Sequence, residues 1–145
     1  TDYPVTTPGR NALIRQQSLE IRTKILNSKN DYGLIYFYSP ECDYCIEQDG
    51  ILHYFVERYG WEIKKINIQE STSLASMFNV TSTPYILLIY RNNQDYLPVS
   101  AGVVSLADME ERLYRGIRLL AGEITPEEYS IYDFQRGGTF DVKKR

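Results

Sequence analysis

The two cysteines of this 145-residue chain stand three positions apart, as Cys42 and Cys45, and no other cysteine is present. A short apolar and aromatic run at residues 34–38 precedes them, which is typical of a strand buried on both faces of a sheet that helices cover. Apolar residues at helical spacing follow from about Cys42 to Arg58. The pair therefore lies where a buried strand gives way to a helix, and the fold has to provide that junction.

The start of a helix is a favourable place for a reactive sulfur. Its free backbone N–H groups and partial positive charge stabilise a thiolate, which is the nucleophilic form of cysteine. We therefore expect a lowered pKa for Cys42, although the carboxylates of Glu41 and Asp43 limit that decrease. Cys45 lies one turn deeper on the same face and can attack a mixed disulfide formed by Cys42, which releases the bound partner.

Three other interpretations of the pair stay open at this point. A structural zinc site needs four ligands, and His53 is the single further soft ligand in the chain, so no metal is predicted. His53 itself is expected to be a packed or surface residue. A purely structural disulfide restrains the unfolded chain little across so short a loop. Two ordinary buried thiols are a poor fit to a helix-opening pair.

The order of helices and strands predicted along the rest of the chain is that of one mixed α/β sandwich around a single sheet. The predicted elements are a helix at 11–27 opened by Thr7 and Pro8, strands at 62–68, 85–90 and 96–101, a helix at 71–78, a hairpin loop at 91–95, and a helix capped by Ser105 that runs to about 121 and ends at Gly122. Around Thr125 and Pro126 the sequence predicts one helical turn, and Gly137, Gly138 and residues 143–145 suggest a flexible end.

Apolar spacing also predicts which faces of the helices are buried. In the first helix the spaced residues are Leu13, Ile14, Leu19, Ile21, Ile25 and Leu26. In the helix that follows the cysteines, the residues expected to point inward are Ile46, Ile51, Leu52, Phe55 and Val56, with Gly60 as the C-cap. Trp61 is expected to be a core or rim anchor.

The composition is that of one globular domain, with 43% hydrophobic and 24% charged residues. A net charge of −3 does not provide the basic surface that nucleic acid or an anionic membrane requires. No apolar run approaches the roughly 20 residues of a membrane span. The sequence does not begin with Met and shows no signal peptide, as expected of a processed mature chain or a trimmed one.

Several separated motifs together resemble the thioredoxin superfamily. They are the strand and redox helix at 34–45, the next strand at 65–68, the helix end, loop and proline strand at 78–88, and Gly102 followed by the helix at 105–113. The resemblance covers about residues 33–121. It implies a thioredoxin-like three-layer α/β/α sandwich with a mixed central sheet and a cis-proline loop. An N-terminal helical extension at 1–32 and a partly flexible C-terminal tail at 123–145 would then flank a thioredoxin-like domain at 33–122.

The resemblance also implies a substrate-binding loop. By that resemblance the Thr83–Pro84 bond is cis, and the backbone of Thr83 is free to pair with a substrate peptide beside Cys42 in the manner of a β-strand. The alternative is a plain trans proline at the start of an edge strand. Tyr44, together with Thr83, resembles the corresponding residues of the bacterial periplasmic isomerases and is a further candidate for substrate binding.

One position departs from the thioredoxin pattern. Thioredoxin has a buried aspartate on the strand before the redox pair, where it can accept the proton of the second cysteine, and this chain has Tyr36 there. Lys65 matches the lysine that pairs with that aspartate, so it is expected to lack its partner and to be a solvated strand lysine. Its alternative role, shared with Glu41 and Asp43, is proton transfer or tuning of the cysteine pKa. The departure favours disulfide formation or isomerisation over general reduction.

The flanking segments resemble the TraF-like and TrbB-like thioredoxins of conjugative type IV secretion systems. The segments are the Arg- and Gln-rich stretch at 15–19, the strand at 32–38 and the stretch at 122–128. This resemblance implies a periplasmic location in a Gram-negative bacterium and protein substrates among pilus or secretion-channel components.

The cysteine pair and the family resemblance together suggest two alternative functions. The first is a protein thiol–disulfide oxidoreductase, an oxidase or isomerase without a cofactor, that supports folding or assembly of conjugation or secretion machinery. The alternative is a thioredoxin-fold assembly or docking factor of a type IV secretion system whose redox activity is dispensable. In that case the N-terminal helix, the tail and surface tyrosines would make the contacts.

Overall fold

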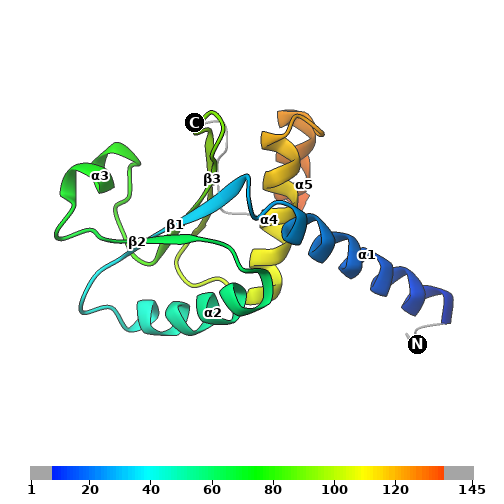
Figure 1. The fold of residues 1–145 in the computed structure, drawn as a ribbon, viewed down its shortest axis with the longest axis horizontal. Helices are drawn as coiled ribbons and strands as arrows, with labels where there is room; N and C mark the ends of the chain where they lie inside the picture. The colour runs from blue at the N-terminus through cyan, green and yellow to red at the C-terminus, as the bar shows by residue number, and fades with distance from the viewer. Residues whose placement is uncertain (1–7, 136–145) are drawn as a thin grey trace.

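Four strands form one mixed sheet at the centre of this computed structural model, which describes residues 8–135 (Figure 1). The strands are β1 (Tyr32–Tyr38), β2 (Ile63–Asn67), β3 (Tyr85–Tyr90) and β4 (Tyr96–Ala101), in the spatial order β2-β1-β3-β4. β1 runs parallel to β2 and antiparallel to β3, and β3 pairs antiparallel with β4. Strand β1, which precedes the two cysteines, is therefore an inner strand with neighbours on both sides.

Helices cover both faces of the sheet, as the three-layer prediction requires. Helices α2 (Asp43–Tyr59) and α4 (Leu106–Leu120) cover one face, and α3 (Thr72–Met77) covers the other. Because side chains alternate along a strand, Tyr36 of β1 packs in the core under α2 and α4, while Phe37 packs in the second core with Ala75 of α3. The predicted three-layer sandwich is confirmed.

Capping residues set the ends of the two large helices. Gly60 adopts a left-handed conformation (φ 67°) and its N–H bonds to the carbonyl of Val56, which ends α2 as predicted. Ser105 accepts a hydrogen bond from the N–H of Asp108 at 3.1 Å and caps α4. Gly122, with φ 78°, follows the end of α4. These short-range signals were readable from the sequence because each depends on the local backbone.

The buried face of α2 differs from the predicted one. Ile46 and Val56 were expected to point inward, but they are 70% and 38% exposed. The residues that this helix buries are Cys45, Gln48, Leu52, Phe55 and Tyr59. The helix is rotated so that Cys45 and Gln48 face the sheet and α4, which moves the two predicted apolar residues to the surface.

Helix α1 (Pro8–Asn27) projects away from the sheet at its N-terminal end, and its C-terminal part packs on α4 (Figure 1). Ile25 is fully buried, and its carbonyl accepts a hydrogen bond from the indole of Trp61 at 2.9 Å. The predicted core position of Trp61 is thus confirmed. Most of the other spaced apolar residues of α1 are exposed, namely Leu13, Ile14, Leu19 and Leu26.

Helix α5 (Pro126–Gln135) is longer than the single turn that was predicted after Thr125. The side chain of Arg115 on α4 donates a hydrogen bond to the carbonyl of Tyr129 at 2.7 Å, which ties α5 to α4. The predicted N-cap Thr7 and the predicted flexible end at 137–145 lie outside the described residues.

A pair of helical glycines tests the packing of α4 against the sheet. A Cβ added at Gly116 would lie 3.0 Å from Leu88 Cδ2, inside the core, whereas one added at Gly50 of α2 meets no atom within 4 Å. We expect Gly50→Ala to stabilise the protein by up to about 1 kcal/mol through helix propensity. Gly116→Ala is expected to lose about 1 kcal/mol net, because overpacking exceeds the propensity gain. Urea unfolding of both variants measures the difference, and equal stabilisation would contradict this packing.

Buried tyrosines predict a loss of stability in alkali. Burial, and secondarily nearby negative charge, raises the pKa of Tyr32 to about 12, and burial with the hydrogen bond to Glu110 raises the pKa of Tyr59 to about 12. The unfolded chain releases these protons near the ordinary value of about 10, so stability is intact below pH 10 and falls as the pH rises toward 12. Each group lowers the free energy of unfolding by about 1.4 kcal/mol per pH unit in that window.

Urea unfolding at pH 8 and pH 11 measures this loss. The Tyr59→Phe protein is expected to be less stable at pH 8 by about 1 kcal/mol, since its hydrogen bond to Glu110 is gone. It should nevertheless lose less stability than the unchanged protein on going to pH 11. An equal loss in both proteins would show that Tyr59 is not responsible.

Candidate active site

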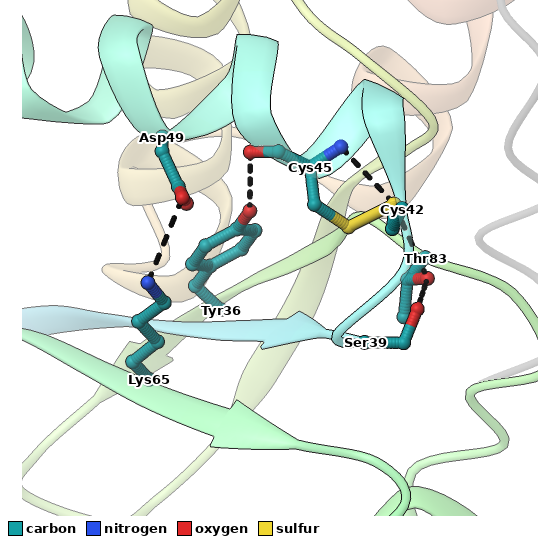
Figure 2. Close-up of a disulfide and its surroundings, with 7 residues drawn as sticks. All are labelled: Tyr36, Ser39, Cys42, Cys45, Asp49, Lys65 and Thr83. Carbon is teal, nitrogen blue, oxygen red and sulfur yellow. Dashed lines mark hydrogen bonds and ion pairs between the residues drawn. A yellow bond between two sulfur atoms is a disulfide. The ribbon is translucent and has the colours of Figure 1, made fainter.

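Cys42 and Cys45 form a disulfide at the start of α2 (Figure 2). Cys42 is the N-cap of the helix, and its sulfur accepts a hydrogen bond from the Cys45 N–H at 3.0 Å. Cys42 is partly exposed, whereas Cys45 is only 4% exposed. A sulfur that occupies the N-cap position meets the free N–H groups that stabilise negative charge. The geometry provides an accessible outer sulfur and a buried inner sulfur.

Thr83 and Pro84 lie beside the outer sulfur. The Thr83–Pro84 peptide bond is cis, as predicted. The hydroxyl of Thr83 donates to Cys42 Sγ at 3.7 Å and lies 2.7 Å from the hydroxyl of Ser39, which follows β1 (Figure 2). The tertiary fold thus brings together two segments that are about 40 residues apart in the sequence. Ser39 was not predicted, although its position between the strand and the cysteines was a signal.

Tyr36 lies beneath the inner cysteine. Its hydroxyl donates to the carbonyl oxygen of Cys45 at 3.1 Å, and the side chain is 1% exposed (Figure 2). Burial raises the pKa of Tyr36 well above its usual range, and the nearby carboxylate of Asp49 raises it further. Tyr36 therefore remains a protonated hydrogen-bond donor that supports the first turn of α2.

Lys65 is exposed on β2, as predicted for a solvated strand lysine, but it has an acidic partner, which it was expected to lack. Its Nζ lies 3.6 Å from Asp49 Oδ2 (Figure 2). The same Nζ lies 4.6 Å from the ring centroid of Tyr38. The partner was missed because the acid was expected on β1, whereas it is on α2, four residues after Cys45. Helical spacing puts Asp49 on the same face as Cys45, and that signal was available in the sequence.

Gln48 is a second buried polar residue of α2 that the sequence did not reveal. It is fully buried, and its side-chain amide bonds in both directions to the backbone of Val104. The amide Nε2 donates to the Val104 carbonyl at 3.3 Å, and the Val104 N–H donates to Oε1 at 2.8 Å. This double hydrogen bond fixes the redox helix to the segment that leads into α4.

The other predicted site residues surround the disulfide at the surface. Glu41, Asp43 and Tyr44 are exposed, and Tyr44 is 67% exposed. His53 is also exposed, and its Nε2 lies 3.1 Å from a carboxylate oxygen of Glu57, in agreement with the expected surface position.

Residues 8–135 contain no group of three or more His, Cys, Asp or Glu side chains arranged to hold a metal ion. In the same part of the chain, none of the helices has the length and apolar character needed to cross a membrane.

The fold and the disulfide pair define a thioredoxin-like chain of the thiol–disulfide oxidoreductase class. A thioredoxin of Buchnera aphidicola subsp. Acyrthosiphon pisum (strain APS) is 28% identical over 109 residues, which are 74% of this chain and 98% of that protein. The structure of thioredoxin-2, a component of malaria parasite protein secretion machinery, matches with a TM-score of 0.53 and 26% identity over 57% of this chain and 81% of that one. Fasciola hepatica thioredoxin shares the fold, with a TM-score of 0.51 and 16% identity over 68% and 93% of the two chains.

Within that class the chain belongs to the TraF family, described as F plasmid transfer operon protein, which matches residues 1–114. The match includes both cysteines, the Thr83–Pro84 loop and the start of α4. The two resemblances drawn from the motifs, to thioredoxins and to TraF, are confirmed.

The Thr83 hydroxyl provides a test of how the site stabilises the outer sulfur. In reduced protein we expect Thr83→Val to raise the pKa of Cys42 by about one unit, since a hydrogen bond to a charged group contributes about 1.5–3 kcal/mol. The pH dependence of iodoacetamide alkylation of Cys42 measures this pKa. Thr81→Val, at an exposed threonine two residues earlier, is the matched control. An unchanged profile in Thr83→Val would contradict a role for this hydroxyl.

Proposed function

We propose that this chain is a protein thiol–disulfide oxidoreductase that forms or isomerises disulfides in proteins of a conjugation or secretion apparatus. The observation that carries the proposal is the disulfide at the start of α2, with its outer sulfur partly exposed and its inner sulfur buried. A substrate can reach Cys42, while Cys45 is reserved for the intramolecular step. Such a division of roles is what disulfide exchange through a mixed disulfide requires.

The proposed chemistry runs through Cys42. In the oxidising direction a substrate thiolate attacks Cys42 Sγ, the Cys42–Cys45 bond breaks, and Cys45 leaves with the electron pair. A second substrate thiol then attacks the mixed disulfide and releases reduced Cys42. The Cys45 N–H at 3.0 Å and the Thr83 hydroxyl at 3.7 Å are the donors that stabilise Cys42 as a thiolate.

Substrate contact is proposed for the surface around the outer sulfur. The hydroxyl of Thr83 contacts Cys42, Pro84 follows Thr83 in the cis-proline loop, and exposed Tyr44 offers an aromatic contact two residues after Cys42. Glu41 and Asp43 add negative charge beside Cys42, which opposes thiolate formation. The proposed role of these two carboxylates is to keep the pKa of Cys42 from becoming very low.

The direction of the reaction is proposed from the residues between and opposite the cysteines. Tyr44 before the second cysteine and Thr83 before the proline resemble the periplasmic isomerases, and the dipeptide Asp43-Tyr44 is unlike that of thioredoxin. In the sequence, the lack of an acid on β1 favoured disulfide formation or isomerisation over reduction. The structure weakens that reason, because Asp49 of α2 lies near Tyr36. The proposed location is the periplasm, and the proposed substrates are pilus or secretion-channel proteins; membership of the TraF family supports both.

A docking role without redox chemistry is the second candidate, and one observation favours it. Helix α1 carries exposed apolar residues well away from the disulfide, among them Leu13 and Leu19, which is 65% exposed. Surfaces of this kind mark contacts with other proteins when they are contiguous. Cells that carry both Cys42→Ser and Cys45→Ser and still assemble the apparatus normally would favour docking over catalysis.

Two measurements test the enzyme. The protein should reactivate scrambled or reduced ribonuclease in a glutathione buffer, whereas Cys42→Ala should lose this activity and Cys45→Ala should accumulate mixed disulfides. Equilibration with glutathione gives the reduction potential of the pair, for which we expect about −120 to −180 mV. A potential near about −270 mV would instead indicate a reductant. A Cys42→Ala protein with full activity would rule out the proposed chemistry.

A further inference from the structure

The central sheet has two outer edges, and they differ in how they are protected. An edge strand presents unpaired N–H and C=O groups, to which another strand can bind. In β4, Pro98 lacks an N–H, and the register of β4 on β3 is irregular beside it. Arg112 also donates a hydrogen bond to the Val99 carbonyl at 2.9 Å. Strand β2, at the opposite edge, contains no proline and pairs with β1 in regular register (Figure 1).

The hydrogen bonds between β2 and β1 show which backbone groups of β2 are free. Just before and just after β2, the Glu62 carbonyl and the Ile68 N–H bond to β1, at 3.1 Å and 3.0 Å. Bonds between parallel strands use every second residue of a strand, so Ile63 and Lys65 direct their N–H and C=O groups away from β1. Within residues 8–135, no hydrogen bond involves these groups. The Asn67 carbonyl accepts bonds from the following turn, so the free stretch ends there.

A groove lies beside this free edge, on the face of the sheet that α2 covers. It has a volume of about 340 Å³, and its apolar lining comes from Leu52 and Val56 of α2 and Ile63 of β2. Val56 is 38% exposed although it is apolar. Paired residues of neighbouring strands direct their side chains to the same face of a sheet. A residue of an added strand beside Ile63 would therefore place its side chain at this groove, which favours an apolar one.

Two lysines of β2 indicate the charge of a partner strand. Lys64 and Lys65 are both exposed, and they point to opposite faces of the sheet because side chains alternate along a strand. Lys65 faces α2 and lies 3.6 Å from Asp49 (Figure 2). Lys64 points to the α3 face, and it takes part in none of the ion pairs formed within residues 8–135. An acidic residue of an added strand beside Lys64 would provide the missing partner.

Two copies of this edge would pair poorly with each other. In such a pair the lysines of one β2 would face those of the other, and like charges across two strands are destabilising. Lysines on an edge strand are a common protection against association between identical edges. The same positive charge attracts a strand that carries carboxylates. The observations therefore favour a different protein over a second copy of this chain.

We propose that the free edge of β2 binds an extended segment of a partner protein in which apolar residues alternate with acidic ones. The segment adds a strand to the sheet through main-chain hydrogen bonds to Ile63 and Lys65, and it places a carboxylate next to Lys64. Because β2 and β3 flank β1 on opposite sides, this edge lies away from the Thr83–Pro84 loop that precedes β3. A bound partner therefore leaves the surface proposed for disulfide exchange open.

Fluorescence polarisation of a labelled synthetic peptide with four Glu-Val repeats tests the proposal on the oxidised full chain. We expect saturable binding that weakens as salt is added, because the paired charges are exposed. Peptides of four Lys-Val and four Glu-Ser repeats are the matched controls, since the first has the wrong charge and the second lacks the apolar side chains. Each control should bind about tenfold more weakly. A Glu-Val peptide that does not bind, or three peptides that bind alike, would overturn the proposal.

Three substitutions test whether the peptide binds at β2. Lys65→Pro removes an N–H that points away from β1, whereas Lys65→Ala removes the same ammonium and keeps that N–H. We expect Lys65→Pro to bind the Glu-Val peptide about tenfold more weakly than Lys65→Ala does. Lys64→Glu should weaken binding of the Glu-Val peptide about fivefold and strengthen binding of the Lys-Val peptide by a similar factor. A Lys64→Glu protein that binds both peptides as the unchanged protein does would contradict the assignment.

Amide hydrogen exchange of the unchanged protein, followed by NMR, tests the site without any substitution. Bound Glu-Val peptide should slow exchange at Ile63 and Lys65, whereas Lys64, whose N–H faces β1, should change little. Binding without this alternating protection would overturn the proposal.

Two further measurements separate this proposal from its alternatives. Sedimentation of the chain alone should show a monomer, and self-association that Lys65→Pro abolishes would assign the edge to a second copy instead. The Glu-Val peptide should bind Cys42→Ala as tightly as the unchanged protein. Binding therefore stands or falls independently of the redox activity proposed above.

Discussion

The hydrogen bond from the Cys45 N–H to Cys42 Sγ is the interaction on which the rest of the site depends. It makes the sulfur of Cys42 the N-cap of α2, so the same contact begins the helix and stabilises negative charge on the nucleophile. The junction exists because β1 is an inner strand that ends just before Cys42, and because α2 lies across the sheet with Cys45 on its buried face.

The helix that carries the cysteines is held at three separate places by polar contacts. Tyr36 bonds the carbonyl of Cys45 from below, Gln48 bonds both backbone groups of Val104, and Tyr59 bonds Glu110 of α4. All three side chains are buried or nearly so, and a buried polar group costs free energy unless it is paired. These contacts therefore favour a single position of α2, which keeps the outer sulfur next to Thr83.

The carboxylate that faces Lys65 comes from a different element than the thioredoxin pattern predicts. A tyrosine replaces the strand carboxylate, yet Lys65 still meets a carboxylate, because Asp49 reaches the same region from α2. The sequence could show Tyr36 and Asp49 separately. It could not show that a strand lysine and a helix acid, 16 residues apart, lie within 3.6 Å, since that depends on how the helix packs on the sheet.

The sequence alone determined the strand-to-helix junction at Cys42, the order of the elements, the caps at Gly60 and Ser105, and the proline loop, because each depends on local backbone preferences or motif spacing. Tertiary structure decided the rotation of α2, which exposes Ile46, and the approach of Ser39 and Thr83 to the sulfur. Apolar spacing gives the period of a helix. The face that is buried depends on the surfaces packed against it, which only the folded chain provides.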